Sequence, residues 1–198
     1  GVGPLELSLA DAGNPCVFIA ADALGLAGTE MPDVLDSQSE LLDRLESIRC
    51  SASVAMGISD SIEAAANIPS IPKVALVSPA QVATTLSGVS IGQSECDVTL
   101  RMISVGQPHR AIPVTGSMCT AIAAQIIGTV VHRLCRPEVV PDDIRIAHPS
   151  GVARVGATVN QQSGKWIAEN AVLYRTARRL MDGQVYLSAA KTPGLSAG

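Results

Sequence analysis

Residues 116–134 form a stretch that is apolar almost all the way round a helix, and this feature constrains the fold more than any other. A helix without a polar face is stable only when it is buried on most sides. Its longest apolar run, residues 122–131, is interrupted by Gln125 and Thr129 and is far shorter than the ~20 residues that cross a membrane. We therefore expect a central, buried helix that ends before Pro137.

Short runs on both sides of this helix have the alternating or continuously apolar pattern of strands. They lie at residues 5–9, 16–20, 73–78, 97–102, 144–146, 152–155, 166–168, 171–174 and 185–187. The run at 97–102 alternates polar and apolar residues, which predicts a half-buried strand. Strands before and after one central helix indicate an α+β fold, in which a mostly antiparallel sheet is wrapped round the helix.

Extra helices are expected on the surface of this sheet. Ser37 and Glu40 have the spacing of a capping box, which predicts that a helix starts there and ends at Gly57. Its buried face would consist of Leu41, Leu45, Ile48, Ala52 and Ala55. A shorter helix is expected over residues 61–66, and the Gly, Ser and Thr of residues 82–93 predict a loop.

Composition and charge exclude several classes of function. The length of 198 residues suits one compact unit. A net charge of -4 without a basic cluster argues against nucleic acid as a partner, and an aromatic content of 2% leaves no platform for stacking bases. Residues 1–9 lack the pattern of a signal peptide, so we expect a soluble, cytoplasmic protein with no membrane partner.

No pattern in the chain indicates a metal or a cofactor. The five cysteines form no C-x-x-C pair and are odd in number, so reduced thiols are expected. His109, His132 and His148 lie far apart, without a helical i, i+4 partner or a carboxylate cluster. No glycine-rich phosphate loop or dinucleotide fingerprint is present, so any chemistry is expected to be cofactor-free.

The start of the central helix is the first candidate binding site. The first amides of a helix have no intrahelical partner and lie at its positive end, which favours an anion when the side chains are small. Thr115, Gly116 and Ser117 meet that condition, and we expect them to bind a carboxylate. The alternative is ordinary N-capping by Thr115 or Ser117.

Other single residues have a functional and a structural interpretation. Lys73, at the start of an apolar strand, suits a substrate carboxylate, although most such lysines extend into solvent. His109 precedes the helix and is either a donor or a structural histidine, and Asn14 either contacts a ligand or bonds its own turn. Cys119 is in the first part of the helix, where a thiol pKa falls, but a packing role is favoured over a nucleophilic one.

Six blocks of the chain, in order, resemble the PrpF family. They read DAGNPCVF (residues 11–18), IPKVA (71–75), RMISVG (101–106), HRA with TG (109–111 and 115–116), HPSG (148–151) and RTARRLMDG (175–183). The blocks extend over nearly the whole chain, which makes the resemblance specific. The family includes 2-methylaconitate cis-trans isomerase, 4-oxalomesaconate tautomerase and methylitaconate isomerase.

The resemblance implies a diaminopimelate-epimerase-like fold, in which two lobes hold the substrate between the N-termini of their central helices. In the family the catalytic Cys and a proton-moving Lys lie in the first lobe. This chain resembles the second lobe alone, so residues 1–190 are expected to form a C-terminal, substrate-binding lobe followed by a flexible tail at 191–198. No catalytic residue is therefore assigned to this chain.

The implied activity is a proton transfer that shifts or rotates a C=C bond in a small di- or tricarboxylic acid such as an aconitate. By position, Lys73, Ser104 and His109 resemble substrate-contacting residues, and Asn14 matches a turn that lines the cleft. The partners implied are the carboxylate and either the missing N-terminal lobe or a second copy of the chain. Two other hypotheses remain: a dimerising or carboxylate-binding module without catalysis, and a thiol enzyme that uses Cys119.

Overall fold

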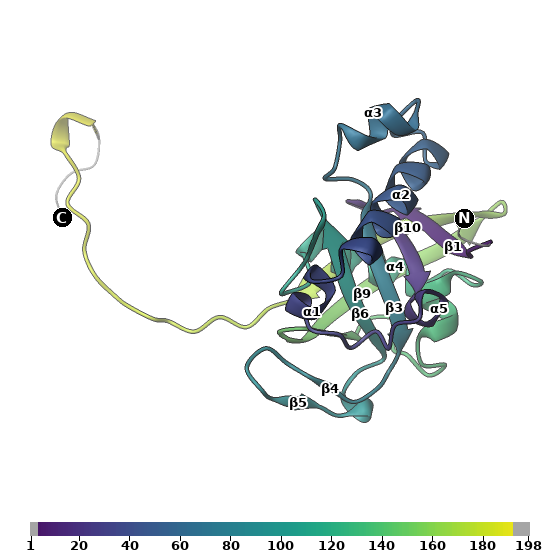
Figure 1. The fold of residues 1–198 in the computed structure, drawn as a ribbon. Coiled ribbons are helices and arrows are strands. Elements are labelled where there is room, and N and C mark those ends of the chain that lie inside the picture. The colour runs from purple at the N-terminus through teal and green to yellow at the C-terminus, as the bar shows by residue number, and fades with distance from the viewer. Residues whose placement is uncertain (1–3, 192–198) are drawn as a thin grey trace.

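The computed structural model of the chain describes residues 4–191 and contains one large, curled sheet (Figure 1). Its strands are β1 (Leu7–Asp11), β2 (Pro15–Ala20), β3 (Lys73–Pro79), β6 (Val98–Ser104), β7 (Gln107–Pro108), β8 (Ile144–His148), β9 (Gly151–Gln162) and β10 (Lys165–Tyr174). The order is β1-β2-β3-β6-β8-β9-β10, with β7 paired to β6. The pairs β2–β3 and β6–β8 are parallel and the others are antiparallel, which confirms the mostly antiparallel α+β fold.

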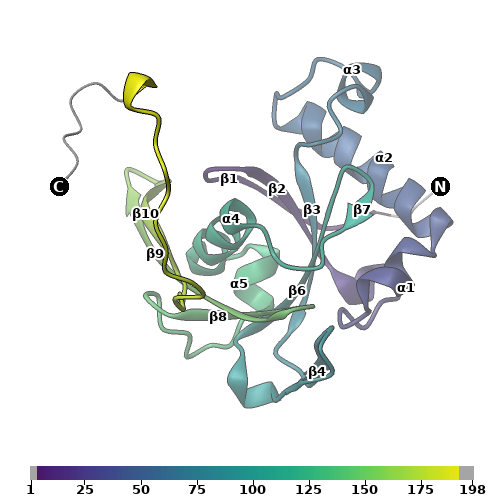
Figure 2. The same cartoon turned by 90° about the vertical axis from the view of Figure 1, so that its left-hand side faces the viewer.

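The helices are divided between the two faces of the sheet (Figure 2). They are α1 (Pro32–Asp36), α2 (Ser39–Ala55), α3 (Ile62–Ala66), α4 (Val114–Gln125) and α5 (Val130–Leu134). The curled sheet surrounds α4 and α5, whereas α1, α2 and α3 lie on the outer face. A two-stranded hairpin of β4 (Ala83–Thr84) and β5 (Ser90–Ile91) occupies part of the stretch expected to be loop.

The central strands are buried on both faces, which explains their continuous apolar sequence. In β2, Cys16 and Phe18 belong to the core around α4 and α5, whereas Val17 and Ile19 belong to the core under α2. This alternation is the two-residue period of a strand. Each face therefore has its own hydrophobic core, and β2, β3 and β6 separate the two.

The expectation of one helix over residues 116–134 is wrong in its bounds. Helix α4 starts at Val114 and ends at Gln125, and the separate helix α5 follows a turn in which Gly128 has a φ of +89°. Thr129 starts α5 by accepting a hydrogen bond from the amide of His132, 3.0 Å away. The turn lets the chain change direction, so that both helices pack inside one curled sheet.

The predicted capping box is also wrong, because Ser37 ends a helix that the sequence analysis did not predict. Its hydroxyl donates to the carbonyl of Val34, 2.8 Å away, at the C-terminus of α1. Helix α2 therefore begins at Ser39 without a side-chain cap. Its predicted end is confirmed, since Gly57 has a φ of +70° just after the C-cap, and Ser61 caps α3 through the amide of Ala64.

Strand β6 is buried along its whole length rather than half-buried as expected. Thr99 and Arg101 are both buried, and the loop before α1 contacts Arg101. The Arg101 guanidinium donates to the carbonyls of Thr29 and Glu30 at 3.0 and 2.7 Å. Burial lowers the pKa of Arg101 to about 10. A local alternation of polar residues cannot reveal that a distant loop will contact one of them.

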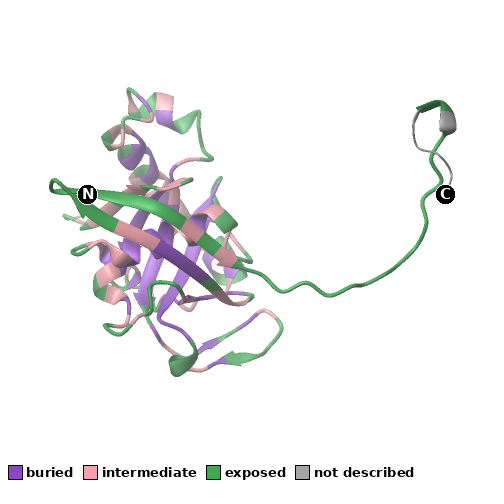
Figure 3. Ribbon diagram, turned by 180° about the vertical axis from the view of Figure 1, so that it is seen from behind, coloured by how far each residue is buried: buried purple, intermediate pink, exposed green. Residues whose placement is uncertain are grey.

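The C-terminal third differs from expectation in two places. Strand β10 is one strand with an irregularity between Ala168 and Asn170, where two strands were expected. The strand expected at residues 185–187 is absent, because residues 175–188 leave the sheet as an exposed, extended segment (Figures 1 and 3). Of the expected flexible tail, residues 192–198 lie outside the described residues.

Two general features of the chain bear on its environment and chemistry. All five cysteines are free and buried, in agreement with the expectation of reduced thiols. Within residues 4–191, no helix has both the length and the apolar character needed to span a bilayer.

Candidate functional site

Lys73 and Ser104 meet at the point where one strand begins and its neighbour ends. Strand β3 starts at Lys73 and β6 ends at Ser104, and because Val74 pairs with Ile103 the two residues are the next ones along the antiparallel ladder. The Lys73 Nζ donates to the Ser104 Oγ at 3.0 Å. Ser104 is only 9% exposed. The strand register therefore holds an ammonium group against a hydroxyl at one edge of the core.

His109 is brought to the same place by a tight hairpin. Ser104 pairs with Gln107 across a two-residue turn, and the amide of His109 then donates to the carbonyl of Met102 at 2.7 Å. Its Nε2 is buried without a hydrogen-bond partner. Burial lowers the pKa of His109, and the nearby Lys73 cation lowers it further, so the ring is neutral at pH 7.

Asn14 lies in the turn between β1 and β2, close to the start of β3. Two residues later, Cys16 pairs in parallel with Lys73. The Asn14 side-chain Oδ1 is buried and has no partner, whereas its main-chain carbonyl accepts from the Cys16 thiol at 3.5 Å. Buried polar atoms are normally hydrogen-bonded, so the Asn14 Oδ1 and the His109 Nε2 each lack the partner that such an atom usually has.

The start of α4 has no side-chain cap. The N-cap residue is Pro113, which offers no hydroxyl or amide, so the alternative that Thr115 or Ser117 caps this helix is wrong. The Ser117 hydroxyl instead donates to the Val114 carbonyl at 2.7 Å. A Cβ on Gly116 would lie 2.5 Å from the Met102 Sδ, so the missing side chain lets the first turn pack against β6.

The predicted binding residues do not all face one place. Lys73 and Ser104 are in contact, His109 lies near Lys73, and Gly116 is joined to them through Met102. Ser117 instead lines a separate cavity of about 340 Å³ with His148 and Arg175, between the helix start and the ends of β8 and β10. Thr115 is half-buried in the first turn of α4.

Cys119 has the surroundings of a packing residue. It is 0% exposed, and its thiol lies 3.6 Å from the carbonyl of Ala10. Cys16, also 0% exposed, lies beside it, and hydrogen bonding to Cys119 together with burial raises the pKa of Cys16. Sequence reasoning missed Cys16 as a neighbour of Lys73, since only the parallel pairing of β2 with β3 brings them together.

Lys73, Ser104 and His109 together offer one cation, a hydroxyl and an imidazole. These groups suit a carboxylate, which accepts hydrogen bonds and is attracted by the ammonium. Among residues 4–191, no three His, Cys, Asp or Glu side chains are grouped closely enough to hold a metal ion.

The turn that positions His109 contains a strained residue. Val105 has a φ of +53° and Gly106 a φ of +70°, in the left-handed region that β-branched residues avoid. Val105 is 57% exposed, so its side chain adds little to the core. Val105→Asn is expected to stabilise the chain by about 1 kcal/mol, because Asn tolerates this conformation.

Urea unfolding measures this effect, with Val82→Asn as the control. Val82 is 65% exposed and does not have a positive φ. An equal gain in both variants, or a gain in neither, would show that the backbone of Val105 is not strained.

Comparisons with known proteins agree on one family. A family model described as "PrpF protein" matches residues 1–188. The 2-methyl-aconitate isomerase of Shewanella oneidensis is 35% identical over 185 residues, which are 93% of this chain and 46% of that protein. The 3-methylitaconate isomerase of Eubacterium barkeri is 36% identical over 191 residues, 96% of this chain and 49% of that protein.

A solved structure has the same fold as this chain. The crystal structure of methylitaconate-delta-isomerase superimposes with a TM-score of 0.80 at 34% identity, over 98% of this chain and 50% of that one. This match confirms the fold class expected from the sequence. The chain spans about half the length of the curated relatives it matches.

Proposed function

This chain belongs to the PrpF family, and we propose that it is the substrate-binding half of a cofactor-independent isomerase. The reaction would move a proton and shift or rotate a C=C bond in a small di- or tricarboxylic acid. The observation that carries the proposal is the Lys73–Ser104 contact near the buried, unpaired Nε2 of His109.

Each group of the site has a role in holding such an acid. Lys73 would pair with a carboxylate, and Ser104 would keep the ammonium in place and donate to the same anion. Neutral His109 and the amide of Asn14 would give direction to the polar contacts. The uncapped amides at the start of α4, near Thr115 and Gly116, would stabilise the negative charge that develops when a proton leaves a carbon next to the carboxylate.

The catalytic proton transfer is proposed to need a second half of similar size. In this proposal the sheet and helices, up to the end of β10 at Tyr174, form one lobe, and the residues that remove and return the proton come from the facing lobe. The matched relatives, which bear the names of isomerases, are about twice as long as the matched region, and this difference in length supports the idea. The chain alone would then bind carboxylates weakly and catalyse little.

A calorimetric measurement of trans-aconitate binding to the chain tests the proposal. Lys73→Met is expected to weaken binding by about 10-fold, the effect of removing one charge-assisted contact from a partly exposed anion site. Lys165→Met is the matched control, because Lys165 is exposed at the tip of the β9–β10 hairpin. Equal affinities in both variants and the unmodified chain would contradict a carboxylate site at Lys73.

A second candidate function is a dimerising module, and one observation favours it. The extended segment after β10 carries exposed apolar side chains, among them Leu180 (81%), Met181 (85%) and Val185 (83%). Exposed apolar segments tend to find a partner. Sedimentation that shows only monomer at high concentration would contradict this alternative and leave the carboxylate proposal standing.

A further inference from the structure

Arg49 is a fully buried cation that the candidate site does not include. It lies on α2, on the outer face of the sheet, and is 2% exposed. Its Nε and Nη2 donate to the two carboxylate oxygens of Glu46 at 2.7 and 2.6 Å. A buried arginine is tolerated only when its charge is paired and its donors are satisfied, and here the carboxylate accounts for only two of its five N–H groups.

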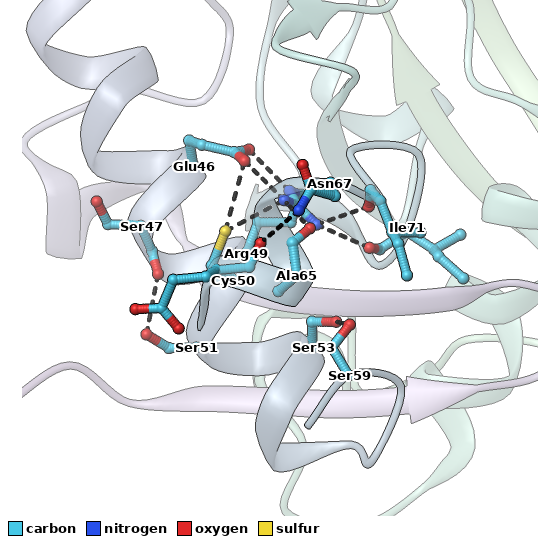
Figure 4. Close-up of polar contacts among 12 residues, drawn as sticks. Glu46, Ser47, Arg49, Cys50, Ser51, Ser53, Ser59, Ala65, Asn67 and Ile71 are labelled. Carbon is cyan, nitrogen blue, oxygen red and sulfur yellow. Dashed lines mark hydrogen bonds and ion pairs between the residues drawn. The ribbon is translucent and has the colours of Figure 1, made fainter. Parts of the chain in front are cut away.

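The remaining donors of Arg49 hold the chain that leads into the site (Figure 4). They reach three main-chain carbonyls, those of Ala65 at 2.9 Å, Ile68 at 3.0 Å and Ile71 at 2.8 Å. These residues belong to the end of α3 and the loop that follows it. All five N–H groups are therefore used, and one rigid guanidinium fixes the whole turn from helix to strand.

This loop is connected to both Lys73 and Ser104, the two residues of the contact in the candidate site. Ile71 lies two residues before Lys73, the first residue of β3. On the other side, the carbonyl of Pro69 accepts from the amide of Val105, the residue after Ser104, at 3.3 Å. Arg49 and Ser104 also border the same small cavity of about 10 Å³, so little free volume separates Arg49 from the Lys73–Ser104 contact.

We propose that Arg49 is the positioning residue of the carboxylate site and fixes the place at which Lys73 meets Ser104. The proposal rests on the carboxylate-binding function above for its role, but its geometry can be tested independently. Arg49 touches no substrate, and it acts through the backbone that carries Lys73. A lysine at this position could pair with Glu46, but its single ammonium could not also reach three carbonyls in fixed directions.

The His109 imidazole reports on the position of Lys73 without any ligand. Lys73 is the charged group that, after burial, lowers the His109 pKa, so a Lys73 that moves away lets that pKa rise toward 6.5. An NMR titration of His109 in Arg49→Lys is expected to show this rise. Lys73→Met removes the Lys73 charge completely, so its His109 pKa sets the scale for the rise in Arg49→Lys.

Arg145→Lys is the matched control. Arg145 also pairs with a carboxylate, Asp97, and donates to a main-chain carbonyl, that of Ser94 at 2.8 Å, but it lies on β8. Arg49→Lys is expected to raise the His109 pKa and to weaken trans-aconitate binding by about 10-fold, a moderate case of the loss that misplaced groups cause. Arg145→Lys should change neither.

The two proposals fail in different ways. An unchanged His109 pKa in Arg49→Lys, or an equal rise in Arg145→Lys, would overturn the positioning role, the second because it would mark a general loosening of the fold. The His109 pKa could also rise in Arg49→Lys alone while the chain does not bind trans-aconitate. That result would support the positioning role of Arg49 and overturn the proposed function. Arg49→Lys retains the charge opposite Glu46, which makes it better suited to fold than Arg49→Met.

Discussion

Asp97→Ala is expected to lower the free energy of unfolding by about 2 kcal/mol, because the amide and the guanidinium of Arg145 lose their acceptor, although the Arg145 side chain is 33% exposed. The Asp97 side chain is 5% exposed and accepts three hydrogen bonds from Arg145. These come from the amide at 2.8 Å, the Nε at 3.1 Å and the Nη2 at 2.6 Å. The pair joins the start of β6 to β8, where the sheet has only a short parallel ladder.

Asp143→Ala is the matched control for this effect. Asp143 pairs with Arg154 through both carboxylate oxygens, so the chemistry is the same, but the Arg154 side chain is 62% exposed. Exposed ion pairs contribute up to about 1 kcal/mol. Urea unfolding at neutral pH compares the two variants, and a loss from Asp97→Ala no larger than the loss from Asp143→Ala would contradict the prediction.

Stability is expected to fall as the pH is lowered from 6.5 toward 4, because the half-buried His148 ring is held in its neutral form. Partial burial, together with the Arg101 and Arg175 cations, lowers the pKa of His148 to about 4. The amide of Ser150 donates to its Nδ1 at 3.2 Å, a bond that needs an unprotonated nitrogen.

The sign follows from the two pKa values. Between them the unfolded chain binds the proton and the folded chain does not, so the His148 contribution is complete above 6.5 and is lost as the pH approaches 4. With allowance for solvent screening, the loss is about 2 kcal/mol between about pH 7.5 and about pH 4.5.

His148→Gln isolates this contribution, because glutamine does not titrate. Unfolding in urea at the two pH values should show a smaller loss in the variant than in the unmodified chain. The remaining loss includes His109, whose pKa is also lowered and whose effect therefore has the same sign. Equal losses in the two chains would show that folding does not hold His148 as a neutral ring.

Several elements could be predicted because their signals are local. The strand that starts at Lys73, the helix end at Gly57 and the short helix over residues 61–66 depend on residues close in sequence, and all three are confirmed. The six family blocks also identified the family. They occur in the family's order along the chain, and they contain residues that come together only in the folded structure. The assignment of Lys73, Ser104 and His109 to one site came from that resemblance, and the structure brings these three residues together.

Other features depended on packing between distant segments. Ser37 and Glu40 have the spacing of a capping box, but the preceding residues fold as α1 and use Ser37 at its end. The burial of Arg101 depends on the loop carrying Thr29 and Glu30, about seventy residues earlier. The hydrogen bonds of Arg49 could not be predicted from the sequence for the same reason, since most of their acceptors are main-chain carbonyls, which every residue has.

The sequence by itself determined the α+β fold class, through apolar periodicity, and the family, through the resemblance of six blocks. Apolar periodicity is enough for the first because it sets which surfaces must be buried. Only the tertiary structure decided that the central segment is two helices, that Ser117 lines a cavity with His148, and that Arg49 donates to the carbonyl of Ile71. These depend on strand register and on main-chain contacts, which become defined only when distant segments pack against one another.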